Sequence, residues 1–329
     1  MVPGKDQKTT GANSIGVLTF SSGIVDVNRL QIGFQSQSAA TSAGIGRLIV
    51  NGPAATLSVN TTLELGRMSG GAGTTNTFGE LVINGGSTLA KTIVAGAGST
   101  SNSVAVNNGV LVITNTAGAL ASPLNNLALT NSALRVSVAS GRTNVVAVNL
   151  TTGGTSNVVN IASLPVISVF PAPFSLVKYA APIRGAGYNF VLGSMPTGPL
   201  YGAYLSNNTA DASVDLVVIA PKPSITSIAQ IGANIVISGT NGISGSQYYV
   251  LSSTNVTLPA TNWTRVMTNV FDGAGNFQFT NAVGWQPGAE VLSAAGAVSK
   301  TCYMSNKPEE FLRFLCNRCY GSGGPATIL

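Results

Sequence analysis

The chain repeats itself at a nearly constant spacing, and this repetition constrains its fold more than any other feature. Two short patterns alternate, one reading Leu/Ile-x-Ile/Leu/Ala-Gly or similar and the other Gly-x-Leu-Ile/Val-Val/Ile. Their copies lie at residues 30–33, 46–52, 63–66, 79–85, 93–96 and 109–113. The offset is 33 between the first two copies (63 − 30 and 79 − 46) and 30 between the next two (93 − 63 and 109 − 79). A period of this size predicts a solenoid, in which each unit buries its apolar face against the next.

Each copy consists of short runs of β-branched residues bounded by Gly, Asn or Ser, which is typical of strands and turns. Equivalent residues are therefore expected to stack inside the solenoid. The expected columns are Leu48 with Leu81 and Leu111, and Ile32 with Leu65 and Val94 or residues near it. The bend after one strand is expected at Gly33, Gly66 and Gly96, since glycine permits sharp turns. Asn51 and Asn84 are expected to form a short amide ladder.

The predicted fold is all-β: a right-handed parallel β-helix (solenoid) followed by a small antiparallel β-sandwich. A terminal coil must hide its edge from other chains, so hairpins are expected after the repeats. Short, closely spaced strands with Asp-Gly and Gly-Asn turns then favour a small sandwich. The expected parts are a disordered N-terminus (1–12), solenoid repeats (13–170), cap hairpins (171–220), a linker (221–223), an incomplete fibronectin- or immunoglobulin-like β-sandwich (224–283) and an atypical tail (284–329).

The composition agrees with a folded chain and argues against two kinds of partner. Charged residues make up 8% of the chain and apolar residues 44%, whereas disordered chains combine low hydrophobicity with high charge. The net charge of +6 comes from cations placed singly along the sequence, so we expect no nucleic-acid partner. Apolar runs such as 158–170 are interrupted by polar residues, so no transmembrane segment is expected.

Cysteine usage and the N-terminus suggest a compartment. No cysteine precedes Cys302, and a long β-rich chain without thiols suits an exported bacterial protein that does not depend on disulfides. Residues 1–12 have no apolar signal-peptide core. We therefore expect a secreted or cell-surface location, with the export signal upstream of this sequence.

Several segments resemble known families. In residues 13–220 the carriers are the Gly-x-Leu-Val-Ile-Asn-Gly coils together with residues 108–113, 174–179, 205–210 and 214–216. This part is similar to autotransporter-associated β-strand repeat proteins. In residues 224–282 the carriers are residues 249–255, 262–264 and 275–280, which resemble a fibronectin-like module of the Verrucomicrobia type. The resemblance implies a cell-surface β-helix with a C-terminal module, and it implies no catalytic residues.

The tail departs from the second pattern. Modules of this kind end in a strand reading roughly Arg-Phe-Tyr-Leu-Leu, which this chain lacks, and from Trp285 onward the sequence changes character. All three cysteines and a helix-like stretch, residues 308–319, lie there. Codons for residues 285–299 can be chosen so that a frame one base later supplies the missing strand. The hypothesis is that the tail is a frameshifted translation.

Little in the sequence supports catalysis or metal binding. The chain has no histidine, which removes the commonest general base and metal ligand. Cys316 and Cys319 have C-x2-C spacing, but a structural zinc needs four ligands and only Cys302 remains to join them. We therefore expect no catalytic residue, no metal site and no cofactor.

Four residues are the candidates for carbohydrate contact. Glu64 and Glu80 lie within one predicted coil, and a pair of carboxylates on one face suits glycoside hydrolysis. Glu80 aligns with Arg47 in the preceding coil, however, which favours a solvent-facing structural position. Tyr248 and Trp263 offer a surface for sugar stacking, although a small sandwich usually places its Trp and one Tyr in its core.

The expected function is therefore a non-catalytic structural or adhesive segment of a secreted or cell-surface bacterial repeat protein. The alternative is a carbohydrate-active or carbohydrate-binding β-helix passenger that uses the four candidate residues. In either case the partner is an unidentified surface ligand or polysaccharide. An open cleft holding both glutamates or an exposed Trp263 indole would favour the alternative.

Sequencing the flanking DNA tests the export and frameshift hypotheses together. We expect an upstream signal peptide with further coils and a downstream frame that completes the missing strand. An intact, solitary reading frame with a well-packed tail would contradict both expectations.

Overall fold

The protein is described by a computed structural model that covers residues 3–6, 13–36, 42–68, 77–97, 101–197, 201–253, 258–282, 301–307 and 310–313. Almost every element in it is a β-strand; the helix that it describes, η1 (Ala260–Asn262), has three residues, so no described helix reaches across a bilayer. The chain forms two compact units, one comprising Met1–Pro196 with Ala203–Val218 and the other Thr197–Gly202 with Ile219–Leu329. Each unit is considered by itself.

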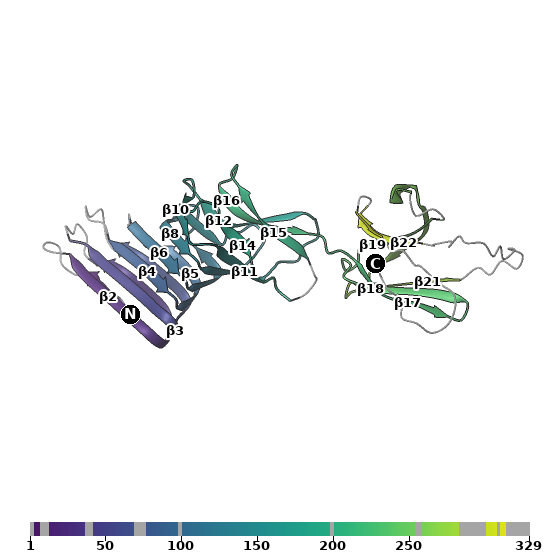
Figure 1. The fold of residues 1–329 in the computed structure, drawn as a ribbon. Helices are drawn as coiled ribbons and strands as arrows, with labels where there is room; N and C mark the ends of the chain where they lie inside the picture. The colour runs from purple at the N-terminus through teal and green to yellow at the C-terminus, as the bar shows by residue number, and fades with distance from the viewer. Residues whose placement is uncertain are drawn as a thin grey trace, which may run out of the picture. The chain divides into compact units, whose positions relative to one another are not determined.

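The first unit is a large, mainly parallel sheet whose strands lie side by side in Figure 1. Its strands are β1 (Lys5–Asp6), β2 (Ser14–Gln35), β3 (Gly44–Met68), β4 (Phe78–Asn84), β5 (Ser87–Ala95), β6 (Ser101–Asn107), β7 (Val110–Ala117), β8 (Leu124–Thr130), β9 (Ala133–Ser137), β10 (Val145–Gly153), β11 (Asn157–Ser163), β12 (Ala172–Tyr179), β13 (Arg184–Gly185), β14 (Phe190–Leu192), β15 (Gly202–Asn208) and β16 (Ser213–Ile219). All-β structure and solenoid-like parallel stacking are thus as predicted.

A column of aliphatic residues runs through the stacked strands. Leu48 of β3 lies opposite Leu81 of β4, as predicted. The column then continues through Val104, Leu127 and Leu150. All of these side chains are buried, so the column forms a continuous apolar core along the solenoid.

The predicted place of Leu111 in this column is wrong. Leu111 belongs to β7 and lies opposite Thr88 of β5, one side further around the coil. The coil shortens from 33 residues (81 − 48) to 23 (104 − 81), so the strand that follows Leu81 in the stack is β6. Its sequence, Ser-Asn-Ser-Val-Ala-Val-Asn, lacks the Gly-x-Leu pattern that identified the earlier copies.

The second predicted column is found. Ile32 lies opposite Leu65, and the next residue is Ala95, the neighbour of Val94, which itself lies opposite Glu64. This side of the coil shrinks along the stack, since β5 keeps four paired residues there and β7 only two. Beyond β7 this side continues through the start of β10, where Val145 lies opposite Ala117.

Glycine and asparagine positions agree in part with expectation. Gly33 and Gly66 have φ of +74° and +63°, and a Cβ at Gly33 would lie 2.0 Å from the carbonyl oxygen of Phe78. Asn51, Asn84 and Asn107 are in register on successive strands. A side-chain hydrogen bond runs from Nδ2 of Asn107 to Oδ1 of Asn84 at 3.0 Å. The predicted pair Asn51 and Asn84 is thus in register, and the amide–amide hydrogen bond joins Asn84 to Asn107 of the next coil.

Seven strands of the first unit pair with one another in a closed ring. Ala117 of β7 forms a bridge with Val145 of β10, which links the two ends of a ring made by β3, β4, β6, β8, β10, β7 and β5. Closure is possible because β3 bends without a break and pairs with β4 through its first part and with β5 through its later part. The sheet is thus barrel-like in its connectivity as well as solenoid-like in its stacking.

Two expected boundaries differ from the structure of the first unit. Residues 3–6, expected to be disordered, include β1, which pairs in parallel with Phe34 and Gln35 of β2. The expected cap hairpins begin with three strands that are still parallel: β12 and β13 pair with β10, and β14 pairs with β11. Antiparallel pairing starts only where β16 joins β12. In both places the coil register continues further than the sequence pattern indicates.

The second unit contains two antiparallel sheets. The first is formed by β17 (Ser224–Ile231), β18 (Asn234–Thr240) and β21 (Phe277–Ala282), and the second by β19 (Gln247–Ser253), β20 (Thr264–Val270), β22 (Thr301–Lys307) and β23 (Glu310–Arg313). Side chains from both sheets share one apolar cluster that includes Ile237 of β18 and Val250 of β19. The Asp272 carboxylate accepts backbone hydrogen bonds from Ala274 and Asn276 and shapes the turn before β21. The hairpin predicted from the Asp-Gly and Gly-Asn pattern is wrong, because this turn leads from β20 in one sheet to β21 in the other.

The tail contributes strands to this unit. Residues 301–307, expected to lie outside the sandwich, pair with β19 from Tyr249 to Ser253. Residues 310–313 form β23, so the predicted helix is wrong at these positions; the rest of residues 308–319 lies outside the described residues. A strand is added to a sheet edge through hydrogen bonds between backbone groups. Because these bonds do not depend on the side chains, the sequence pattern did not indicate β22.

The inner column predicts that truncating a leucine destabilises the fold more when its side chain points into the core than when it points outward. Leu81→Ala should lower the free energy of unfolding by about 2–5 kcal/mol, because it empties a fully buried site. Leu89→Ala, on the outer side of β5, should cost less than about 1 kcal/mol. Urea denaturation of the two variants measures both changes, and equal losses would contradict this assignment of the core.

Candidate functional site

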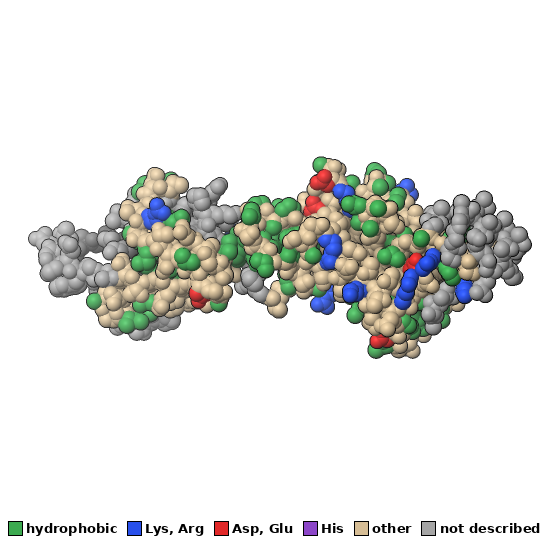
Figure 2. Space-filling model, turned by 180° about the vertical axis from the view of Figure 1, so that it is seen from behind, with side chains coloured by type: hydrophobic (Ala, Val, Ile, Leu, Met, Phe, Trp, Pro, Cys, Tyr) green, Lys and Arg blue, Asp and Glu red, His purple; other side chains and the backbone are tan. Residues whose placement is uncertain are grey.

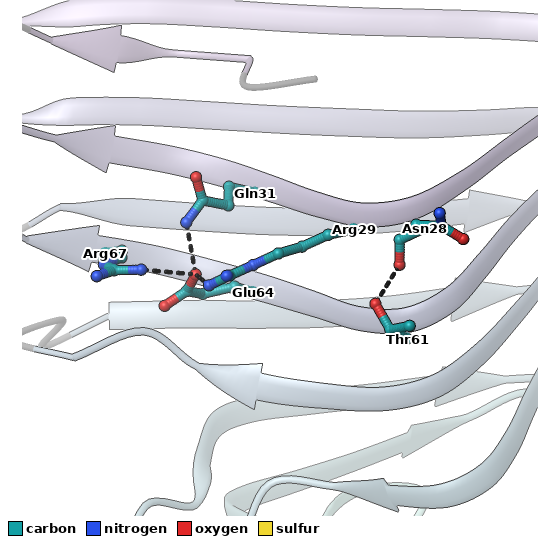
Figure 3. A network of polar contacts seen from close by, with 6 residues as sticks. All are labelled: Asn28, Arg29, Gln31, Thr61, Glu64 and Arg67. Atoms are coloured by element: carbon teal, nitrogen blue, oxygen red, sulfur yellow. Dashed lines mark hydrogen bonds and ion pairs between the residues drawn. The ribbon is translucent and has the colours of Figure 1, made fainter.

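The most concentrated polar cluster of the first unit surrounds Glu64, on the third side of the coil (Figure 3). One carboxylate oxygen, Oε2, accepts hydrogen bonds from Arg29 at 2.8 Å and from Gln31 at 2.6 Å. The guanidinium of Arg67 lies 3.5 Å from the same oxygen. Register places Gln31 directly opposite Glu64 on the neighbouring strand. Stacking of β2 on β3 therefore assembles the cluster from two coils.

The charge state of Glu64 follows from these contacts. The Glu64 side chain is 8% exposed. Burial alone would raise its pKa, but the hydrogen bonds from Gln31 and Arg29 and the charge of Arg67 outweigh burial and hold the pKa below its usual value. A glycosidase acid needs the opposite shift, since it must stay protonated to donate its proton. Glu64 is thus a structural anion in this arrangement.

Glu80, the second candidate carboxylate, is also paired. It lies on β4 opposite Arg47 of β3, and its Oε2 accepts a hydrogen bond from Nε of that arginine. Glu64 instead lies in the later part of β3, whose neighbours are β2 and β5. The structure therefore places the two glutamates on different sides of the coil, each with its own arginine partner, and it does not assemble them into a carboxylate pair.

Trp263 and Tyr248 are both buried in the second unit. The Trp263 indole is 6% exposed, packs against Leu251 and donates its Nε1 hydrogen to the carbonyl of Leu258 at 3.0 Å. Trp263 is a core aromatic, as the sequence favours. Neither face of the indole is presented to solvent for a sugar ring to stack on.

Tyr248 is fully buried among aromatic side chains. Its ring centroid lies 4.8 Å from that of Phe271 and 5.5 Å from that of Phe277. Its hydroxyl donates to the carbonyl of Gln278 at 3.1 Å, and burial raises the pKa of the phenol. A buried ring with its hydroxyl already bonded holds the two sheets together, and it offers no contact to a ligand in this conformation.

Four arginines among the described residues of the first unit are held by polar partners within the fold. On the face shown in Figure 2, lysine and arginine side chains are separated by uncharged surface. Three arginines of the solenoid are engaged by Glu64 or Glu80, and Arg142 donates to Asn115 and to the carbonyl of Ser137. Phosphate backbones are bound by several free cations on one face, and this arrangement does not provide them.

The described residues contain no cluster of three metal-ligating side chains. Cys316 and Cys319 lie outside the described residues, so the structure does not bear on the C-x2-C pair. Cys302 is described only through its backbone, which pairs with Ser252 of β19.

No known family's model matches the chain, and no curated protein is detectably similar to it in sequence. The resemblance to autotransporter-associated repeats and to a fibronectin-like module therefore remains a prediction. What the protein does is argued below from its geometry.

One feature of the cap has no counterpart in the sequence analysis. A hollow of ≈ 400 Å³ is lined by Tyr179, Tyr188 and Asn207, and none of its lining residues is charged. Nearby, the buried Asp215 accepts hydrogen bonds from Ser213 and Asn208, and burial together with the charge of Asp215 raises the pKa of Tyr188. The hollow combines residues 179–188 with residues 207–212, two segments that the pairing of β12 with β16 brings together. The lining provides no acid–base pair.

The Glu64 cluster predicts a pH-dependent contribution to stability. Because the folded pKa of Glu64 is depressed, its contribution is present above the ordinary value of 4.5 and is lost as pH falls through the folded pKa. Glu64→Gln should therefore lower the free energy of unfolding by about 1–2 kcal/mol at pH 7, and the difference from wild type should shrink on acidification. Urea denaturation between pH 7 and pH 3 measures this.

The matched control is Glu80→Gln, which removes a carboxylate from a more exposed ion pair on the neighbouring strand. It should cost about 0–1 kcal/mol. A Glu64→Gln penalty that is no larger than this, or that persists unchanged at low pH, would show that the carboxylate does not stabilise the fold as described.

Proposed function

We propose that the chain is a non-catalytic structural or adhesive segment of a secreted or cell-surface bacterial repeat protein. The proposal rests on where the candidate residues lie and which partners they contact. Arginine and glutamate side chains of the solenoid bind one another across neighbouring coils, and the aromatic candidates of the second unit lie in its core. The residues available for chemistry thus serve to hold the fold together.

In architecture, we propose a right-handed parallel β-helix followed by a small β-sandwich. In-register parallel pairing from β1 to β14 supports the helix, and right-handedness is favoured because parallel crossover connections are right-handed in nearly all proteins. The apolar cluster shared by two antiparallel sheets supports the sandwich. The ring closure through β7 and β10 is a local departure from a regular β-helix.

A carbohydrate-active passenger is less well supported. Hydrolysis by two carboxylates needs them about 5–10 Å apart across a bound sugar, with one of them protonated. Glu64 and Glu80 are paired with arginines on different sides of the coil, and the pKa of Glu64 is lowered. A surface ligand or polysaccharide remains the expected partner, bound without turnover.

The location and the absence of turnover are tested together on cells that produce the protein. Antibodies against the solenoid should label intact cells as strongly as permeabilised ones. Purified protein should release no reducing ends from a panel of polysaccharides, and Glu64→Gln and Glu80→Gln should leave that result unchanged. Labelling that requires permeabilisation would contradict a surface role, and hydrolysis abolished by either variant would establish the enzymatic alternative.

A further inference from the structure

The hollow in the cap lies between two turns of the first unit. One wall is the segment that follows β12, residues 179–183 with 187 and 188, and the other is the turn between β15 and β16, residues 207, 209 and 212. Its volume of ≈ 400 Å³ lies within the range of about 300–1,000 Å³ that is usual for small-molecule sites. The hollow is therefore large enough for one small ligand.

Both walls are fixed by hydrogen bonds within the fold. The buried Thr152 donates its hydroxyl hydrogen to the carbonyl of Gly187 at 2.6 Å. In the other wall, Oδ1 of Asn208 accepts the backbone N–H of Asp211 at 3.1 Å, and Nδ2 of Asn208 donates to the buried carboxylate of Asp215 at 2.8 Å. Because neither wall has to be ordered on binding, little binding free energy is lost to conformational change of the protein.

The lining combines apolar surface, two aromatic rings and uncharged polar groups. Tyr179 and Tyr188 contribute the rings, and residues 180–183 contribute apolar surface. Asn207 contributes an amide and Thr209 a hydroxyl. Among the described lining residues there is no lysine, arginine, aspartate or glutamate. Because such a lining does not compensate the charge of an ionic ligand, the hollow favours a neutral one.

Two hydrogen-bond donors of the hollow have no acceptor within the fold. The hydroxyl of Tyr179 donates to Oδ1 of Asn207 at 3.2 Å and so orients the amide, and no described residue accepts a hydrogen bond from its Nδ2. The Tyr188 hydroxyl is buried and has no hydrogen-bond partner among the described residues. A buried hydroxyl without a partner is unfavourable. Both groups are complementary to oxygen atoms of a ligand.

We propose that the hollow binds one sugar residue of a neutral glycan. A pyranose ring has apolar C–H faces that pack on tyrosine rings and hydroxyl oxygens that accept hydrogen bonds, and the lining offers both kinds of contact. A small shift of the Tyr188 side chain brings its hydroxyl into contact with the ligand. The inference rests on the proposed adhesive role, for which it names a site and a ligand class.

A cationic ligand is the alternative, because tyrosine rings also attract cations. The carboxylate of Asp215 is not part of the lining; it is buried and already accepts hydrogen bonds from Ser213 and Asn208. The amide hydrogens of Asn207 carry partial positive charge and disfavour a cation beside them. The lining therefore favours the oxygens of a glycan.

One substitution separates these two ligands. Asn207→Asp keeps an oxygen that accepts the hydrogen bond from Tyr179 and replaces the Nδ2 donor with a negatively charged oxygen. A glycan then loses a hydrogen bond, whereas a cation gains an attractive charge. The matched control is Asn126→Asp on β8, where Oδ1 likewise accepts a hydrogen bond from a neighbour, Asn149, at 3.2 Å. Both variants add one negative charge, and only the first changes the hollow.

A second substitution separates binding from folding. Tyr188→Phe keeps the ring and removes the hydroxyl that has no partner in the fold. The midpoint of urea denaturation should therefore not fall, while glycan binding should weaken by about two- to tenfold, the loss of one hydrogen bond.

The test is isothermal titration calorimetry of the full chain with cellohexaose, xylohexaose and N-acetylchitohexaose, and with choline as the cationic probe. We expect at least one of the three oligosaccharides to bind saturably, with equal affinity for wild type and Asn126→Asp. Its binding to Asn207→Asp should be about two- to tenfold weaker. Choline should not bind to wild type.

Three outcomes would overturn the proposal. The first is that none of the oligosaccharides binds to wild type, and the second is that Asn207→Asp binds them as tightly as Asn126→Asp does. The third is that choline binds, and binds more tightly to Asn207→Asp, which would make the hollow a cation site. The adhesive role has its own readout: surface labelling without glycan binding rejects this site alone, and glycan binding without surface labelling rejects the surface role alone.

Discussion

In-register pairing of parallel strands is the interaction on which the rest of the first unit depends. Each coil is held to its neighbours by backbone hydrogen bonds, and these fix which side chains meet inside and outside. The same ladder that stacks Leu48 on Leu81 also sets Gln31 against Glu64 and Arg47 against Glu80. A one-residue slip would move every inner side chain to the surface, so the apolar core and the outer ion pairs share one register.

Ion pairs between neighbouring coils explain why the solenoid contains glutamates that do not form a catalytic site. Few charges occur in the chain, and both Glu64 and Glu80 are placed where a neighbouring coil supplies arginine. A buried carboxylate without such a partner would carry a large desolvation cost. Ion pairs between arginine and glutamate of adjacent coils therefore add specificity to the stacking. A catalytic role would require that one of these glutamates be released from its arginine.

Much of the fold could be predicted from the sequence because the 33-residue offset is visible wherever the coils keep the same length. The prediction failed at Leu111, where a shorter coil brought β6 into the place expected for β7, and β6 does not carry the repeat's signature. The burial of Trp263 followed from the usual role of tryptophan in a small β-domain. The surroundings of Glu64 did not, because its partners reside on two strands and the sign of its pKa shift depends on their distances.

The change in coil length has a consequence for how such a chain can vary. Two successive coils differ by ten residues (33 − 23), yet the inner column passes from Leu81 to Val104 without losing its register. The extra residues are accommodated between strands, where lengthening a loop costs little entropy. The stack of coils therefore tolerates insertions between its strands. Its length, by contrast, increases only in steps of about 4.8 Å, the spacing added by one further coil. Duplication of coils and divergence of corners are thereby independent routes of change in this architecture.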